Sequence, residues 1–340
     1  MMTSYGTDLP GLIKQHGSVH TAVFLDGPMT GERLLWSGQQ ILWCQPDQAD
    51  RWKRLIPQLN DTPICQISIL ANAMIFVEQL VAMPKLVILG GGHISLAICP
   101  IGKIIGFHVT VVDDREEYAN NQRFPMADDV ICADFAHAIA QIPDTANTYY
   151  VIVTRGHAAD ALCAERLLRR DFAYLGMIGS RTKVAKTRSK LADLGFSAAE
   201  LDRMHAPIGL PIGGETPGEI AVSIAAEIVQ TKNQVKRSEL PLDLLAALTA
   251  TNEPAVLATI IEKTGSSPRG NGSRMLVNQE GLVSGTIGGG AVEMAAIEKA
   301  RAMLETGEDF AVERYDLSDS ASASLGMICG GRNQVLFERV

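Results

Sequence analysis

The sequence predicts an α/β protein in which a Rossmann-like parallel sheet is followed by a smaller α+β domain. Between residues 84 and 232, short β-branched runs alternate with helical stretches, which is typical of a parallel sheet. A glycine-rich turn directly follows the first run, as in nucleotide-binding sheets. Further on, a hairpin-like pair of strands meets across Asn278–Gly281. The expected strands of the parallel sheet are Leu86–Leu89, Val109–Val112, Val130–Cys132, Tyr150–Val153 and Leu175–Ile178.

The pattern divides the chain into four parts. An N-terminal segment, 1–82, carries three tryptophans and no motif that assigns it. The Rossmann-like domain spans 83–232, a polar linker 233–240, and the small domain 241–340. In the small domain we expect helices at Leu242–Ala250 and about 291–304, and strands at Val256–Ile261, Phe310–Tyr315 and Gln334–Phe337.

One short sequence occurs twice. Met74–Leu80 (MIFVEQL) and Val335–Val340 (VLFERV) both resemble an apolar strand that ends in phenylalanine and glutamate. Short apolar strands often resemble one another by chance, so we favour coincidence as the explanation.

Composition excludes several classes of protein. The 340 residues are 46% hydrophobic and carry a net charge of −8, which disfavours a nucleic-acid binder because such a protein needs a basic face. Neither a signal peptide nor a membrane span is expected. The six cysteines form no CxxC pair, which argues against a zinc ribbon or a disulfide framework, and Cys99, Cys132 and Cys163 lie on expected core elements. We therefore expect a cytoplasmic protein.

The first candidate site is the turn GGGHIS. Gly90 and Gly92 occupy the first two glycine positions of a dinucleotide turn, with His93 at the start of the next helix and Ser95 where a third glycine usually stands. Asp113 ends the next strand, where a ribose-binding carboxylate is expected, and Arg115 would favour an anion. Binding of a nucleotide or a pterin and a purely structural role both stay open.

Two later loops follow strands of the same sheet and would lie at the same edge. One contains Thr154, Arg155 and His157. The other contains Gly179, Ser180 and Arg181 and opens a basic helix with Lys183 and Lys186. Small residues and arginine at a helix start suit a phosphate, although an ordinary turn and helix cap explain them equally well.

The small domain offers a second set of candidates. A polar loop carries Ser266, Ser267 and Arg269, and Arg269 with Arg274 would clamp a phosphate. A glycine-rich turn follows, and Cys329 lies in another before the last strand, as an accessible thiol or a buried structural one. The glycine-turn candidates are Gly288, Gly289, Gly290 and Glu293.

Together these motifs resemble the XdhC/CoxI family. The resemblance covers residues 83–340 and rests on LVILGGGHIS, VVDDREEYANNQRFPMAD, TRGHAAD, GMIGSRTK and PIGLPIGGETPGEIAVSIAAEIV in the larger domain, and on ATIIEKTGSSPRGNGSRMLV, GTIGGGAVE and GMICGG in the smaller. It implies a cytoplasmic maturation factor that binds molybdenum cofactor (molybdopterin), assists its sulfuration, and inserts it into a xanthine- or carbon-monoxide-dehydrogenase-type apo-hydroxylase. A cysteine desulfurase is an implied further partner, and a non-catalytic chaperone role is favoured over an enzyme.

The chain departs from the family pattern in three ways. The small domain follows the Rossmann domain instead of preceding it, so we expect a homodimer in which small domains exchange between chains. Ala291 replaces the cysteine of the family's GGGC motif, which leaves Cys329 as the candidate sulfur or metal ligand. Segment 1–82 is unmatched, although MIFVEQL at its end resembles the strand that normally leads into the family's Rossmann domain.

Two alternatives stay open. An NAD(P)-dependent oxidoreductase is motivated by the glycine turn and Asp113, although no acid–base constellation beyond His157 accompanies them. A regulatory protein that senses a nucleotide without turnover is the other.

Overall fold

The computed structural model describes residues 5–143, 145, 147–234, 236–251, 253–265, 270–316 and 331–340. The chain forms two compact units. Residues 83–235 form one unit, and residues 1–82 combine with 236–340 to form the other.

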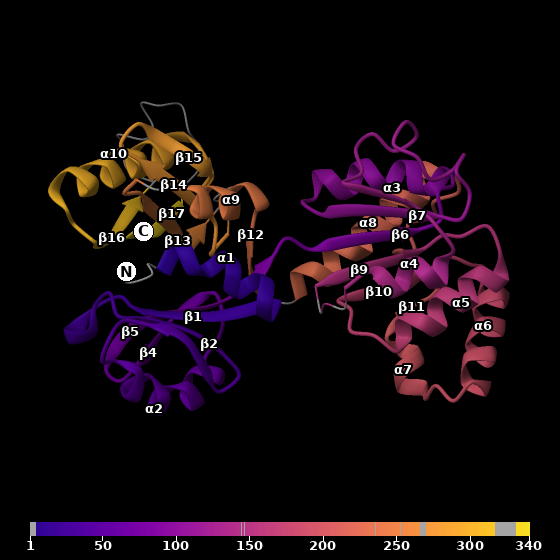
Figure 1. Cartoon of the computed structure of the whole chain (residues 1–340), viewed down its shortest axis with the longest axis horizontal. Helices are drawn as coiled ribbons and strands as arrows, with labels where there is room; N and C mark the ends of the chain where they lie inside the picture. Colours follow the sequence, from indigo (N-terminus) through magenta and orange to yellow (C-terminus); the bar gives the residue numbers. More distant parts are fainter. Residues whose placement is uncertain are drawn as a thin grey trace. The chain divides into compact units, whose positions relative to one another are not determined.

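The Rossmann unit contains a parallel six-stranded sheet in the order β11-β10-β9-β6-β7-β8 (Figure 1). Chain order therefore reverses between β6 and β9, which is where such sheets bind ligands. The strands are β6 (Lys85–Leu89), β7 (His108–Asp113), β8 (Asp129–Cys132), β9 (Thr148–Ile152), β10 (Tyr174–Met177) and β11 (Met204–His205). All five predicted strands are present.

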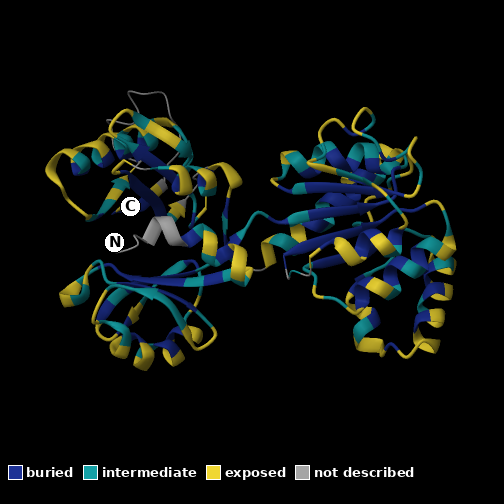
Figure 2. Ribbon diagram, in the orientation of Figure 1, coloured by how far each residue is buried: buried dark blue, intermediate teal, exposed yellow. Residues whose placement is uncertain are grey.

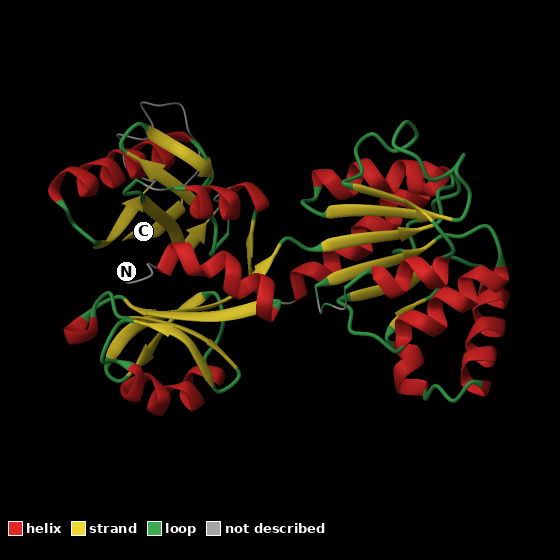
Figure 3. Cartoon of the chain, in the orientation of Figure 1, coloured by secondary structure: helices red, strands yellow, loops and turns green. Residues whose placement is uncertain are grey.

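Helices cover both faces of this sheet (Figure 3). Alternation along the strands explains why: Leu86 and Ile88 pack against α3 and α8, whereas Val87 and Leu89 face α4 to α7. The central strands are accordingly buried throughout (Figure 2). The helices are α3 (His93–Ile104), α4 (Phe135–Gln141), α5 (His157–Leu168), α6 (Arg181–Asp193), α7 (Ala198–Asp202) and α8 (Pro217–Gln234).

The second unit contains two sheets. One has the order β12-β5-β1-β2-β3 with β4 also paired to β5, and the other has the order β15-β14-β13-β17-β16. The first half of the unit contains α1 (Tyr5–His16), β1 (Ser18–Phe24), a 3-10 turn (Gly27–Met29), β2 (Arg33–Ser37), β3 (Gln40–Cys44), α2 (Ala49–Asn60), β4 (Gln66–Leu70) and β5 (Ala73–Ala82). The second half contains β12 (Ser238–Leu240), α9 (Leu242–Ala250), β13 (Val256–Gly265), β14 (Arg274–Asn278), β15 (Gly281–Gly285), α10 (Gly290–Thr306), β16 (Phe310–Asp316) and β17 (Gly331–Arg339).

The predicted elements of the small domain are present, but the expected linker is not a simple tether. Helix α8 continues to Gln234, and Ser238–Leu240 forms β12, which pairs in parallel with Leu80–Ala82 of β5. Ser238 also donates a hydrogen bond of 2.7 Å to the buried carboxylate of Glu78. The polar composition of this segment predicted a linker. Composition does not show that the segment pairs with a strand far away in the sequence.

Cys132 is a further correction. It was expected in the core, but it is exposed at the end of β8, which is an edge strand. Among the described residues, no helix combines the length and the apolar character that a bilayer crossing requires.

Candidate ligand site at the carboxyl edge of the Rossmann sheet

The three glycines after β6 have different roles. Gly90 has a φ of +115°, and a Cβ there would lie 2.5 Å from the carbonyl oxygen of Val153. A Cβ on Gly91 would lie 2.2 Å from the carbonyl oxygen of Tyr118. Both glycines are therefore required by packing. Gly92 precedes α3, and no atom lies within 4 Å of the position that a Cβ would take there, so the start of the helix is approachable from that side.

Ser95 explains how the turn manages without a third glycine. Its side chain is buried and donates a hydrogen bond of 2.5 Å to the carbonyl oxygen of Gly90. The hydroxyl closes the turn onto the helix. His93, the first residue of α3, stays exposed beside Gly92.

Asp113 is buried and fully engaged by the protein. Its two carboxylate oxygens accept four hydrogen bonds, one from the backbone N–H of Gly91 and three from the backbone and guanidinium of Arg115. Burial alone would raise the pKa of Asp113, but the bonds from Arg115 and Gly91 lower it below the ordinary value. A carboxylate offers about four acceptor positions. Asp113, which was expected to bind a ribose, therefore connects the glycine turn to Arg115. The guanidinium of Arg115 lies 3.6 Å from the centre of the Tyr118 ring.

The loop after β9 is organised by a buried carboxylate. Thr154 donates a hydrogen bond of 2.6 Å to Asp160, which has no solvent exposure and forms an ion pair with Lys183 of α6. Arg155 forms a looser pair of 3.4 Å with Asp114. Asp160 therefore connects the loop after β9 to the helix after β10.

A hollow of about 400 Å³ lies between the start of α5 and one face of α6. His157 and Ser180, both predicted as site residues, line it, and Ser180 caps α6 by accepting from the N–H of Lys183. Gly179 precedes the cap, where a Cβ would lie 2.8 Å from the Lys183 side chain. Arg181 begins α6 but does not line the hollow. The full lining is His157, Ala158, Ala161, Ser180, Thr182, Lys183, Lys186, Thr187 and Lys190.

Of the three lysines of this hollow, Lys183 and Lys186 were noted on the basic helix but not assigned to the site, and Lys190 was missed. Lys183, Lys186 and Lys190 are spaced i, i+3, i+7 and therefore share one face of α6. That spacing was visible in the sequence and would have identified them. Hydroxyls, a histidine and ammonium groups around one hollow are suited to a phosphate-bearing anion.

In the small domain, Glu293 organises the predicted glycine-rich turn. One of its oxygens accepts from the hydroxyl of Thr286 at 2.5 Å and from the N–H groups of Ile287 and Gly289 at 3.0 and 3.1 Å. Burial alone would raise the pKa of Glu293, but these bonds lower it. Gly288, Gly289 and Gly290 all have left-handed φ values, from +67° to +122°.

The prediction that Arg274 clamps a phosphate is wrong. Arg274 is 5% exposed, pairs with Glu78 and donates 2.8 Å to the carbonyl oxygen of Gly272. Arg274 begins β14, a buried strand, and its side chain is buried with it. The other loop candidates, Ser266, Ser267, Arg269 and Cys329, lie outside the described residues.

A second hollow, of about 480 Å³, lies at the ends of β13, β16 and β17. Its charges are mixed, because Arg332 pairs with Asp316 at 2.7 Å and both Glu262 and Arg314 line it. Within the ranges that the structure describes, no group of three or more His, Cys, Asp or Glu side chains forms a metal site.

The fold and this edge define a Rossmann protein with a glycine turn after its first strand and a cationic hollow between α5 and α6. Two family models match the chain, the XdhC Rossmann domain over residues 86–228 and the XdhC and CoxI family over residues 248–316. Together they cover more than half of the chain, in the order predicted. The chain belongs to the XdhC/CoxI family.

Two relatives are similar to parts of the chain. The chain is 35% identical over 151 residues to "Uncharacterized protein YqeB" of Escherichia coli K12, covering 44% of this chain and 28% of that protein. It is 28% identical over 160 residues to a Bacillus subtilis 168 protein described as a probable xanthine dehydrogenase subunit, covering 47% of this chain and 46% of that protein. The chain thus spans less than half the length of either relative.

A crystal structure described as a xanthine dehydrogenase from Bacillus halodurans has the same fold. It aligns with a TM-score of 0.50 at 21% identity, over 69% of this chain and 66% of that one.

Proposed function

We propose that this protein is an accessory factor for a xanthine-dehydrogenase-type molybdenum hydroxylase, and that it holds the phosphate-bearing pterin of the molybdenum cofactor without reacting with it. Membership of the XdhC/CoxI family and the relative described as a xanthine dehydrogenase subunit support the accessory role. The observation that carries the binding proposal is the lysine-lined hollow between α5 and α6, the helices that follow β9 and β10.

The described residues fit the anionic end of this cofactor. Lys186 and Lys190 line the hollow and would contact its phosphate. The N–H groups at the start of α3, beside Gly92, offer a second position for an anion at the same edge of the sheet. Lys183 has a different role, because it neutralises buried Asp160. When bound, the cofactor would supply the molybdenum chemistry, and the protein's part is to hold and orient it.

Asp113 favours this function over a nicotinamide-dependent oxidoreductase. A dinucleotide enzyme of this fold uses the carboxylate to accept from the ribose hydroxyls. In this chain four hydrogen bonds from the protein already occupy it. Sulfuration, a desulfurase partner and delivery to the apo-hydroxylase extend the proposal along the lines that the resemblance implies.

Titration of the full chain with molybdopterin, NAD(P) and simple nucleotides tests the proposal. We expect Lys186→Gln with Lys190→Gln to weaken pterin binding at least about tenfold, because each lost phosphate contact costs about 1 kcal/mol or more. Gly92→Val should weaken it independently, since a branched side chain would stand where the ligand approaches the helix start.

Gly218→Val is the matched control, because Gly218 is equally open but lies at the start of α8. Unaltered pterin affinity in both site variants would reject this edge as the binding site. Nicotinamide binding with turnover, and no pterin binding, would select the oxidoreductase.

A further inference from the structure

The two halves of the second unit have the same topology. In the N-terminal half the strand order is β4-β5-β1-β2-β3, and in the C-terminal half it is β16-β17-β13-β14-β15. One helix precedes the first strand in each half, α1 or α9, and one lies between the third and fourth strands, α2 or α10. Each α-helix and each strand of residues 5–82 therefore has a counterpart among residues 242–339.

Strand register makes the correspondence residue by residue. Arg33 lies opposite Val23, which lies opposite Phe76 on its other side. In the C-terminal half, Arg274 lies opposite Thr259, which lies opposite Leu336. Each arginine begins its strand. A register shift follows at the same step in both, at Leu35/Trp36 and at Leu276/Val277.

A glycine precedes each arginine by two residues and has the same backbone role. Gly31 has a φ of +80° and donates 2.9 Å to the carbonyl oxygen of Phe24. Gly272 has a φ of +87° and donates 2.8 Å to that of Ile260. This register aligns Ile75–Leu80 with Val335–Val340, which are the two similar segments seen in the sequence. The two segments therefore occupy equivalent strand positions in the two halves.

Each half packs one face of its sheet on its own helix. Ala22 and Val77 contact the core formed with α2, and their equivalents Ala258 and Phe337 contact the core formed with α10. The other face of each sheet joins cores that contain residues from both halves, such as Leu35 with Leu276 and Phe76 with Leu336.

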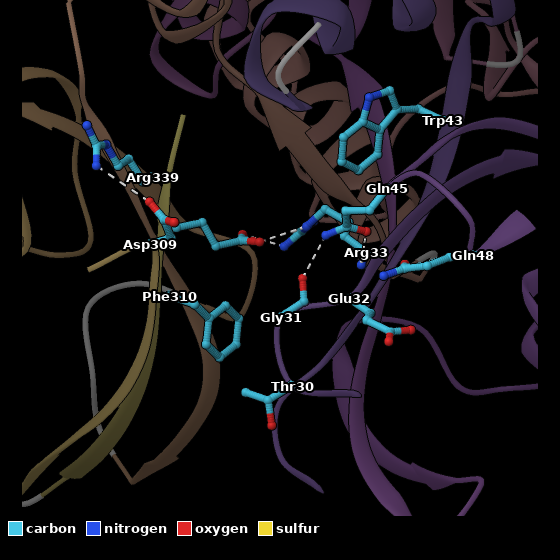
Figure 4. Close-up of a pocket in the computed structure, with 11 residues that line it drawn as sticks. Thr30, Gly31, Glu32, Arg33, Trp43, Gln45, Gln48, Asp309, Phe310 and Arg339 are labelled. Carbon is cyan, nitrogen blue, oxygen red and sulfur yellow. Dashed lines mark hydrogen bonds and ion pairs between the residues drawn. The ribbon is translucent and has the colours of Figure 1, made fainter. Parts of the chain in front are cut away.

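Two buried ion pairs connect these inner faces reciprocally. Arg33 of the N-terminal half binds Glu338 of the C-terminal half, with a hydrogen bond of 2.7 Å from Nε, and Arg274 binds Glu78 in the opposite direction. Arg33 corresponds to Arg274 and Glu78 to Glu338, so residue i contacts j and j contacts i, as in a two-fold dimer interface. Figure 4 shows the Arg33 pair in a hollow of about 400 Å³, beside Gly31 and Phe310.

The N-terminal half keeps this framework without the family's loops. Its fourth and fifth strands are joined by a tight turn at Ala71 and Asn72, with φ values of 51° and 62°, where the C-terminal half has residues 317–330. Asp47 stands at the position of Gly288. The connection from Phe24 to Gly31 is also shorter than that from Ile260 to Gly272, which contains Ser266 and Arg269.

We propose that residues 1–82 are a diverged second copy of the small domain and act as its built-in dimer partner. Each copy carries one arginine and one glutamate at equivalent inner positions, so each inner face is self-complementary. Arg274 and Glu338 would pair equally well with Glu338 and Arg274 of a second copy of this chain. The N-terminal copy occupies the inner face of the C-terminal copy in place of a second chain, because covalent linkage gives it a high effective concentration at that face.

Two charge-reversed forms of the full chain test the proposal by light scattering. In the first, Arg33→Glu with Glu78→Arg places like charges at both buried pairs and leaves Arg274 and Glu338 intact. We expect the C-terminal copies of two chains to pair instead, which doubles the mass of the parent particle. In the second, Arg274→Glu and Glu338→Arg are added, and the parent mass should return.

Reversal of the exposed pair Arg188 and Asp202 of the Rossmann unit is the control and should leave the mass unchanged. An unaltered mass and stability in the first form, or a doubled mass that persists in the second, would overturn the proposal. Should the first form precipitate, the second decides: recovery of a soluble particle of parent mass supports reciprocal pairing, and failure to recover refutes it.

Discussion

At the residue scale, carboxylates in this protein mostly hold backbone and cations in place. Asp113 closes the glycine turn, Asp160 neutralises Lys183, and Glu293 gathers the donors of a glycine-rich turn. Buried or half-buried carboxylates are costly unless such partners surround them. Residues that looked like ligand contacts in the sequence therefore support the loops that a ligand would meet.

Glu293 gives a pH-dependent prediction. Its pKa is lowered in the folded protein, so its contribution to stability is complete above the unfolded value near 4.5 and is lost as the pH falls through the lower folded value. Glu293→Gln should cost about 1 kcal/mol at pH 7, because three hydrogen bonds lose their charge, and the cost should shrink below about pH 4. Denaturant unfolding at both pH values measures this. Glu298→Gln, exposed on the same helix, should cost nothing at either pH, and an equal effect of the two changes would contradict the assignment.

At the element scale, the Rossmann strands and their loops were predictable because each signal is local. A β-branched run followed by a glycine turn predicts a strand end, and parallel strands bring those ends to one edge, where Gly92, His157 and Ser180 were expected. Partners distant in sequence were not predictable. Arg274 looked like a phosphate ligand because nothing near it in the chain indicates Glu78, and β12 looked like a linker for the same reason.

The two equivalent glycines give a prediction about elements. Gly31 and Gly272 both need a left-handed backbone, so alanine should cost about 1–2 kcal/mol at either position. A Cβ at Gly31 meets Phe310 at an ordinary 3.5 Å, whereas one at Gly272 would lie 2.2 Å from the hydroxyl of Ser238 in β12. Gly272→Ala should therefore destabilise by about 1–3 kcal/mol more than Gly31→Ala in denaturant unfolding. Equal costs would mean that β12 does not pack as closely as described.

At the scale of the whole molecule, the chain has two units with separate cores, and one of them is assembled from both ends of the sequence. Segment 1–82 could not be assigned from the sequence because the family's signature lies in loops that this copy lacks. What it retains is a general pattern of strands, plus two buried residues, Arg33 and Glu78, whose partners lie far along the chain. Topology and strand register identify the repeat, because only six residues of each copy are recognisably similar in sequence.

The tryptophans make this assembly measurable. All three, Trp36, Trp43 and Trp52, belong to residues 1–82, so tryptophan fluorescence reports only on the unit that contains both copies. Val335→Ala, a change in the fully buried core of the C-terminal copy, should cost about 2 kcal/mol and shift the fluorescence transition by the full amount, because shared cores and two buried ion pairs make the copies unfold together. Val151→Ala, equally buried in the Rossmann sheet, should lower a circular-dichroism transition and leave the fluorescence transition in place. If Val335→Ala leaves the fluorescence transition unchanged, the N-terminal copy folds alone, and this result would contradict the proposed intramolecular dimer.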